Sequence, residues 1–435
     1  MKKKVLAVSA ACALSAATAV PALALENEFH GMFRVNGIVS NFGSEAGGTV
    51  LADLDNDAPT RSYIEQRARL MYIAKANDDL KLVTHFEIDS RWGDSAYKEK
   101  RNDGGAIGAD QVNIETKNVY LDFNIPSTAI NVKAGIQPFI DSMGGVFVNA
   151  DMAGAIASAK YAGFTNSLGW FRLDEATATS ALGRATRDLF ILDSKYALTK
   201  DVKVGGSYYL LTNDISTENT YTHIVGLNAE AKFEPVTVNG FAAYQFGDVP
   251  GMAGDQSAFA LGGTLRAKAG IGTAKAGFLA FSGEQDANPD NSGWSAISSA
   301  GGSENSFYAS DMLILFRNKW NTSSDKAIIN NFDNTGLAPG LVAAFAGYDA
   351  NVTNKLFING NAGFAWMHHK LGGDSRYIGT EINAEVGYKL FDNMTAMVQG
   401  GYFILGDGIQ DVFNDLTGDD ADDPYMARVV LNYAF

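Results

Sequence analysis

The final eleven residues, 425–435, alternate between apolar and mixed side chains. Every second residue is apolar or aromatic: Tyr425, Ala427, Val429, Leu431, Tyr433 and Phe435. The positions between them include Arg428 and Asn432. Because successive side chains of a strand point to opposite faces, this pattern predicts a strand with one apolar face, aromatic near both ends, and one polar face. Such a strand is typical of a wall between lipid and water; the alternative is a half-buried strand of a soluble sandwich.

The same period of two recurs along the chain, in residues 221–233, 236–246, 259–269 and 378–390. In the last of these, Ile382 and Val386 fall on one face, whereas Glu381 and Glu385 fall on the other. The polar faces carry many charges, which suits a barrel with a wet interior better than a sandwich. We therefore predict an all-β fold, a transmembrane antiparallel β-barrel.

Connections of two lengths separate these segments. Eight are short and rich in turn residues: 77–79, 126–128, 165–167, 199–201, 234–235, 270, 353–354 and 392–393. Nine are long: about 43–60, 93–111, 140–154, 174–187, 213–219, 248–257, 283–338, 368–376 and 406–423. This alternation predicts about 18 strands, or 16 if the Ala- and Gly-rich segments 155–164 and 168–173 do not form a hairpin of the wall.

The N-terminus carries three lysines, then a run of small and apolar residues that ends in Ala22-Leu23-Ala24. This is the pattern of a cleaved signal peptide, so we expect residues 1–24 to be removed and residues 25–435 to form one barrel domain. A retained membrane helix and a lipoprotein are the alternatives. The only cysteine, Cys12, lies within the predicted signal peptide, which excludes a thiolate nucleophile or a disulfide in the mature chain.

The chain is acidic, with a formal net charge of −15 at pH 7. Removal of Lys2, Lys3 and Lys4 with the signal peptide takes this charge to −18. Phosphate repels such a chain, so nucleic acid is not an expected partner. The mean hydropathy of −0.06 is compatible with a barrel, because only half of each strand faces lipid.

Together, the C-terminal strand and the alternation of short and long connections resemble the general porins of the Gram-negative outer membrane. The resemblance makes Tyr433 and Phe435 an insertion signal and implies short periplasmic turns and long extracellular loops. It also implies a homotrimer surrounded by outer-membrane lipid and lipopolysaccharide. The third long connection, about 140–154, would fold inward as a constriction loop with Asp141 and Asp151 as its carboxylates.

The first three strands carry a charged face, which must point to the lumen because an arginine at the lipid midplane costs about 2–4 kcal/mol. Its predicted pore-lining residues are Arg34, Arg61, Glu65, Arg67, Arg69, His85, Glu87, Asp89 and Arg91. One interpretation is a basic cluster that sets a transverse field with the two loop carboxylates. The other is an internal lattice of salt bridges that stiffens the wall. Both can hold.

One acidic stretch resembles the start of a calcium loop: Asp53, Asp55 and Asp57 stand at alternate positions. The glycine expected at the sixth position is replaced by Ala58, and Ile64 stands where a glutamate is expected. An acidic outer loop explains these residues better than a metal site. We expect no cofactor and no bound metal.

The leading functional hypothesis is a channel for passive diffusion of small hydrophilic solutes and ions. A substrate-specific channel would need an aromatic track, whereas the inward Tyr63, Tyr209, Phe241 and Phe403 are scattered. A scaffold barrel that sheathes an electron-transfer cytochrome is a further alternative. An enzyme is not expected, because no nucleophile and histidine converge on one site.

Two points remain open from the sequence. Acidic loops outweigh the basic face, so we expect a weak cation preference that the double substitution Arg67→Ala, Arg69→Ala increases. The connection 283–338 contains an unbroken apolar run, 311–316, without any period. It predicts a loop folded onto the rim or an unassigned strand, and the whole connection could be a loop, a helix or a plug.

Overall fold

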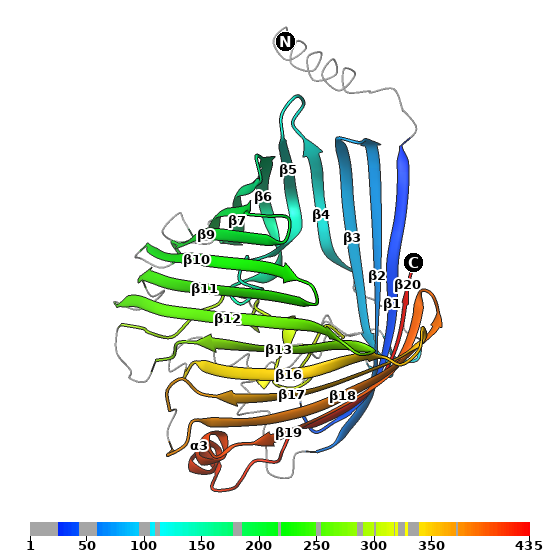
Figure 1. Cartoon of the computed structure of the whole chain (residues 1–435), viewed down its shortest axis with the longest axis vertical. Helices are drawn as coiled ribbons and strands as arrows, with labels where there is room; N and C mark the ends of the chain where they lie inside the picture. The colour runs from blue at the N-terminus through cyan, green and yellow to red at the C-terminus, as the bar shows by residue number, and fades with distance from the viewer. Residues whose placement is uncertain are drawn as a thin grey trace, which may run out of the picture.

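The computed structural model describes residues 25–42, 59–94, 105–108, 114–176, 185–215, 219–248, 254–284, 290–299, 302–316, 318–320, 327–328, 339–370 and 373–435. Eighteen antiparallel strands form one closed barrel, in which each strand pairs with its neighbour in the chain and the last pairs with the first. In Figure 1, β1 to β4 stand upright, whereas β9 to β13 lie across the view as the wall curves round. The predicted fold class and the count of 18 are confirmed.

The strands of the barrel have the following bounds. They are β1 (Glu26–Ser40), β2 (Arg61–Asn77), β3 (Leu80–Arg91), β4 (Ile114–Asn124), β5 (Ile130–Ile140), β6 (Asn149–Tyr161), β7 (Phe164–Glu175), β8 (Thr186–Ala197), β9 (Val202–Asn213), β10 (Thr220–Phe233), β11 (Val236–Asp248), β12 (Asp255–Ala269), β13 (Gly272–Phe281), β16 (Leu341–Asn351), β17 (Leu356–Trp366), β18 (Tyr377–Phe391), β19 (Met394–Leu405) and β20 (Tyr425–Ala434). The Ala- and Gly-rich β6 and β7 pair from Ala153 opposite Arg172 to Tyr161 opposite Phe164, so they form a hairpin of the wall, which rules out the count of 16.

The barrel closes where β20 pairs with β1. Beyond the last strand, the backbone of Phe435 exchanges two hydrogen bonds with Gly31, at 2.8 and 3.0 Å. Val429 is 57% exposed on the outer face of β20, whereas Arg428 is 2% exposed on the inner face. The alternation of the C-terminal strand therefore separates the two faces as its sequence predicts.

The outer wall is apolar, with large aromatic side chains exposed at both ends of the strands. Near the short turns these are Phe29, Tyr161, Phe164, Phe233, Phe391 and Phe435, and near the long connections they are Trp170, Tyr221, Tyr244, Trp366 and Tyr402. Two aromatic girdles around an apolar band are characteristic of barrels that sit in a bilayer.

Five ladders of the wall contain a register shift, and two of these shifts account for departures from the expected alternation. One lies in β4, where Lys117 has no partner between Asn118 and Thr116, and it explains the change of phase that the sequence shows at this point. The other leaves Ile378 of β18 unpaired between Tyr377 and Gly379. Ile378 is consequently fully buried, although simple alternation places it on the outer face with Ile382.

The long connections differ in what they form. The last contains α3 (Asp407–Thr417), an amphipathic helix that the sequence analysis did not predict, with Ile409, Val412 and Phe413 buried. Among the described residues, no helix is long and apolar enough to cross a membrane. The connection between β13 and β16 holds a two-residue hairpin, β14 (Ser298–Ser299) with β15 (Gly302–Ser303), and the 3-10 turn η2 (Tyr308–Ser310).

The apolar run 311–316 is neither a strand nor a cover on the rim. Residues 312 to 316 are at most 4% exposed, and they contact wall residues that face inward. Met312 lies against Gly363 of β17, and Leu313 lies against Gly401 of β19. The run therefore fills part of the barrel interior, as the plug that the sequence left as one of three possibilities.

Candidate permeation path

A cavity of about 680 Å³ remains beside the wall formed by the first six strands. Its lining is polar and charged for the most part: Arg34, Arg67, Arg69, Met71, His85, Glu87, Lys117, Asn118, Pro138, Asn149, Ala150, Asp151, Glu304, Tyr308, Asn318 and Lys319. Five of these residues are cations and three are carboxylates, a formal sum of +2 with histidine neutral. The cavity is thus the part of the barrel interior that suits a hydrated solute.

The charged face of β1 to β3 forms one wall of this cavity. Arg67 makes a bidentate pair with Asp89, with two nitrogen–oxygen distances of 2.7 Å, and lies 3.1 Å from Glu87. Arg69 also pairs with Glu87. These charges bridge neighbouring strands, because Arg67 stands opposite Asp89 and Arg69 opposite Glu87 in the ladder. The structure therefore contains the salt-bridge lattice, and the same side chains line the cavity.

The predicted pore-lining residues separate into two groups. Arg34, Arg67, Arg69, His85 and Glu87 line the cavity. Glu65, Asp89 and Arg91 do not line it. Glu65 and Asp89 are buried, and Arg91 lies 3.2 Å from Glu65 and over the ring of Tyr63. Arg61 is exposed at the first position of β2. The cavity therefore brings together five of the nine residues.

The two predicted loop carboxylates have different surroundings. Asp151 belongs to β6 and not to the loop; its oxygens lie 2.5 Å from Lys117 Nζ and 2.7 Å from Asn118 Nδ2, and it lines the cavity. Asp141 is buried, and each of its oxygens accepts two backbone N–H groups, from Met143, Gly145, Phe147 and Val148. This carboxylate fixes the shape of its own turn and does not line the cavity.

The third long connection, residues 141–148, does turn inward. Met143, Val146, Phe147 and Val148 are buried, and Phe147 stacks on the inward-facing Tyr209. The strands around it make the turn possible. β4 and β5 pair only over residues 119–124 and 131–136, and this pairing ends where Val119 stands opposite Ile136. Pro138, which lacks an N–H group to donate, follows two residues later. The cavity reaches this break, where Lys117, Pro138 and Asp151 line it.

The opposite side of the interior is occupied by the connection between β13 and β16. We call its described residues between 290 and 320 the lumen insert. The first part of the insert bonds to the third connection, where the N–H group of Ile297 donates a hydrogen bond to the carbonyl oxygen of Phe147 at 2.9 Å. The insert supplies Glu304, Tyr308, Asn318 and Lys319 to the cavity lining. Sequence reasoning missed these contributors; the only available signal was the aperiodic apolar run.

Two predicted features cannot be placed. The calcium candidate Asp53, Asp55 and Asp57 and the signal peptide lie outside the described residues. Within the described ranges, no group of three or more His, Cys, Asp or Glu side chains is arranged to hold a metal ion.

The whole chain is similar in fold to solved outer-membrane proteins. No protein-family model and no curated protein matches it. The outer membrane protein OpdK of Pseudomonas aeruginosa superposes with a TM-score of 0.59 at 11% identity, covering 94% of this chain and 98% of that one. OccAB4 of Acinetobacter baumannii gives 0.58 at 14% identity, with 95% and 99% covered. OpdK with vanillate gives 0.57 at 12% identity, with 94% and 98% covered. At such identities the likeness establishes a shared fold, and the resemblance to Gram-negative outer-membrane porins is confirmed at that level.

Proposed function

We propose that this chain is an outer-membrane channel through which small hydrophilic solutes and ions diffuse passively. The observation that carries the proposal is the charged cavity of about 680 Å³ inside a closed barrel. The apolar outer wall with aromatic girdles supports insertion into a bilayer. A cavity of this size suits small solutes, which argues against a barrel that sheathes a folded cytochrome.

Single-channel recording on the purified protein in planar lipid bilayers tests this function. We expect discrete conductance steps that are linear in voltage. Folded barrel protein that inserts into the bilayer without conducting ions would refute the proposal. Cross-linking in mild detergent tests the trimer, which we also propose from the resemblance, and sequencing of the mature N-terminus tests cleavage after Ala24 during export.

A second candidate is a channel selective for small anions, including carboxylates. The formal charge of the cavity lining, +2, favours anions at this position. OpdK, which has a similar fold, has a crystal structure with vanillate. The sequence, by contrast, predicts a weak cation preference from the acidic loops. The reversal potential in a salt gradient decides between them, since the two expectations differ in sign. Block of the current by an added aromatic carboxylate would favour the selective channel.

A further inference from the structure

The lumen insert has buried backbone N–H groups that need hydrogen-bond acceptors, and its apolar side chains cannot provide them. Residues 312–316 are buried in the barrel interior without strand or helix hydrogen bonds of their own. A buried backbone N–H that is left without an acceptor destabilises the fold, because it loses its hydrogen bond to water without replacement. Apolar packing alone therefore does not explain why this segment lies where it does, and the wall has to provide acceptors.

Glu381 of β18 provides them. It is fully buried, and its carboxylate accepts the N–H groups of three successive insert residues: Leu313 at 2.7 Å, Ile314 at 3.1 Å and Leu315 at 2.7 Å. Asn383 donates a fourth hydrogen bond at 2.6 Å. A buried carboxylate is tolerated only when it is well hydrogen-bonded. The acid and the insert backbone thus satisfy each other.

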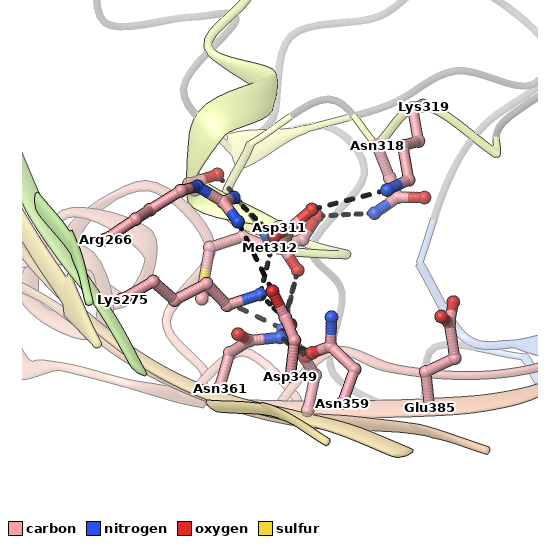
Figure 2. Close-up of polar contacts among 12 residues, drawn as sticks. Arg266, Lys275, Asp311, Met312, Asn318, Lys319, Asp349, Asn359, Asn361 and Glu385 are labelled. Atoms are coloured by element: carbon pink, nitrogen blue, oxygen red, sulfur yellow. Dashed lines mark hydrogen bonds and ion pairs between the residues drawn. The ribbon is translucent and has the colours of Figure 1, made fainter. Parts of the chain in front are cut away.

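Asp311 of the insert makes a second attachment to the wall, shown in Figure 2. Lys275 of β13 lies 2.6 Å from Asp311 and 2.6 Å from Asp349 of β16. Arg266 of β12 joins the same group, 3.5 Å from Asp311 and 3.3 Å from Asp349. The Lys275 side chain is 2% exposed. A cation buried between one carboxylate of the insert and one of the wall fixes the insert against β12 to β16.

The insert then crosses to the strands that close the barrel. Asn318 accepts a hydrogen bond from Arg428 of β20 at 3.0 Å. Asn36 of β1 donates to Trp320 O at 2.9 Å, and the Arg34 guanidinium lies 5.0 Å from the centre of the Trp320 ring. The insert is consequently anchored at both sides of the interior, with the charged cavity beside its far end.

We propose that Glu381 and Asp311 are positioning residues that hold the lumen insert as a fixed constriction. The insert excludes solutes from the half of the interior beside β12 to β19 and confines them to the charged cavity beside β1 to β6. This inference rests on the proposed function, because it names the residues that set the cross-section of the same channel. Neither acid needs to contact a solute.

The variants Glu381→Gln and Asp311→Asn test the proposal. Glu381→Gln keeps the size of the side chain but replaces one acceptor oxygen with an NH2 group facing backbone donors. We expect a roughly twofold rise in single-channel conductance as the insert leaves and the second half of the interior opens to ions. Glu385→Gln is the matched control, since Glu385 lies on the same face of β18 and bonds to Gln399 instead of the insert. Its conductance should match the wild type.

An engineered disulfide between the insert and the wall tests whether a rise in conductance in Glu381→Gln comes from release of the insert. A Cβ added at Gly401 would lie 3.4 Å from the Cβ of Leu313, near the roughly 3.5–4.5 Å range of disulfides. Leu313→Cys with Gly401→Cys should therefore cross-link, and the mature chain offers no competing cysteine if the signal peptide is removed. In the Glu381→Gln background, oxidation should return the conductance to the wild-type value, and a reducing agent should raise it again.

Several outcomes would overturn the proposal. They are unchanged conductance in both Glu381→Gln and Asp311→Asn, an equal rise in Glu385→Gln, or failure of the disulfide to form in the folded barrel. A wild-type barrel that does not conduct would refute the proposed function instead. The yield of the disulfide, read on a gel, would still decide whether the insert lies against β19.

Discussion

The two sides of the barrel interior use buried charge in different ways. On the β1 to β3 side, arginines and carboxylates pair between neighbouring strands, as Arg67 does with Asp89. On the β12 to β19 side, the wall charges reach a segment that belongs to no strand, as Lys275 does with Asp311. The first arrangement leaves a polar surface beside open space, whereas the second fills the space. Similar residues thus make a lining in one place and an anchor in the other.

The largest expected effect tests the anchored side. Lys275→Met removes the buried cation between Asp311 and Asp349 and leaves the more exposed Arg266 as the remaining wall cation beside the two carboxylates. Loss of one partner from a buried ion pair typically costs about 3–5 kcal/mol, so we expect the urea midpoint of the barrel in lipid vesicles to fall markedly. Lys268→Met is the control, since Lys268 lies near an exposed turn with Glu234. Equal midpoints for the two variants would contradict the assignment of Lys275 as an anchor.

The next prediction concerns the lining side and changes selectivity more than stability. Arg67→Ala with Arg69→Ala removes two positive charges that lie beside Glu87 and Asp89, so the wall beside the cavity becomes more negative. We expect the reversal potential in a salt gradient to move towards cation preference, most clearly at low salt, where charges are least screened. Lys232→Ala with Lys268→Ala removes the same charge near the short turns and should leave the potential almost unchanged. A shift towards anions in the arginine variant would sink the assignment of this wall as a selectivity surface.

The smallest expected effect concerns Gly283, which lies just after β13 at the start of the connection that contains the lumen insert. Gly283 N–H donates to His368 Nδ1 at 3.3 Å. Burial lowers the pKa of His368, and the neighbouring His369 and Arg376 lower it further. A lowered pKa in the folded state means that the neutral ring is favoured. The contact is therefore fully present above the unfolded pKa of about 6.5 and is lost as the pH falls through the lower pKa of the folded state.

Hydrogen exchange at the Gly283 amide measures this contact directly. We expect faster exchange at pH 5 than at pH 7.5, after correction for the intrinsic rate. In His368→Ala the amide should exchange quickly at both pH values. Corrected protection of Gly283 that stays constant with pH in the wild type would show that His368 does not hold this entry.

The wall was predictable from the sequence because a strand between two environments repeats with a period of two. That rule identified β20 and the charged faces of β2 and β3. It failed at Ile378, because a β-bulge adds one residue and reverses the faces beyond it. It also failed to predict α3, because a search for a period of two does not detect a helical period within a long connection.

The interior was much less predictable, since its contacts join residues far apart in the chain. Glu381 and Glu385 have the same place in the pattern of β18, yet only Glu381 accepts hydrogen bonds from the insert. Asp141 and Asp151 were expected to act alike, yet one closes its own turn and the other pairs with Lys117 across the break in the wall. Periodicity indicates which face a residue occupies but not which segment will meet it.

The insert also joins the two ends of the chain. Residues 318–320 bond to Asn36 and Arg34 of β1 and to Arg428 of β20, the strands that meet where the barrel closes. Residues from the last third of the sequence thus link the first strand to the last from the inside. These contacts exist together only when β1 and β20 lie side by side, so closure of the wall and docking of residues 318–320 stabilise each other.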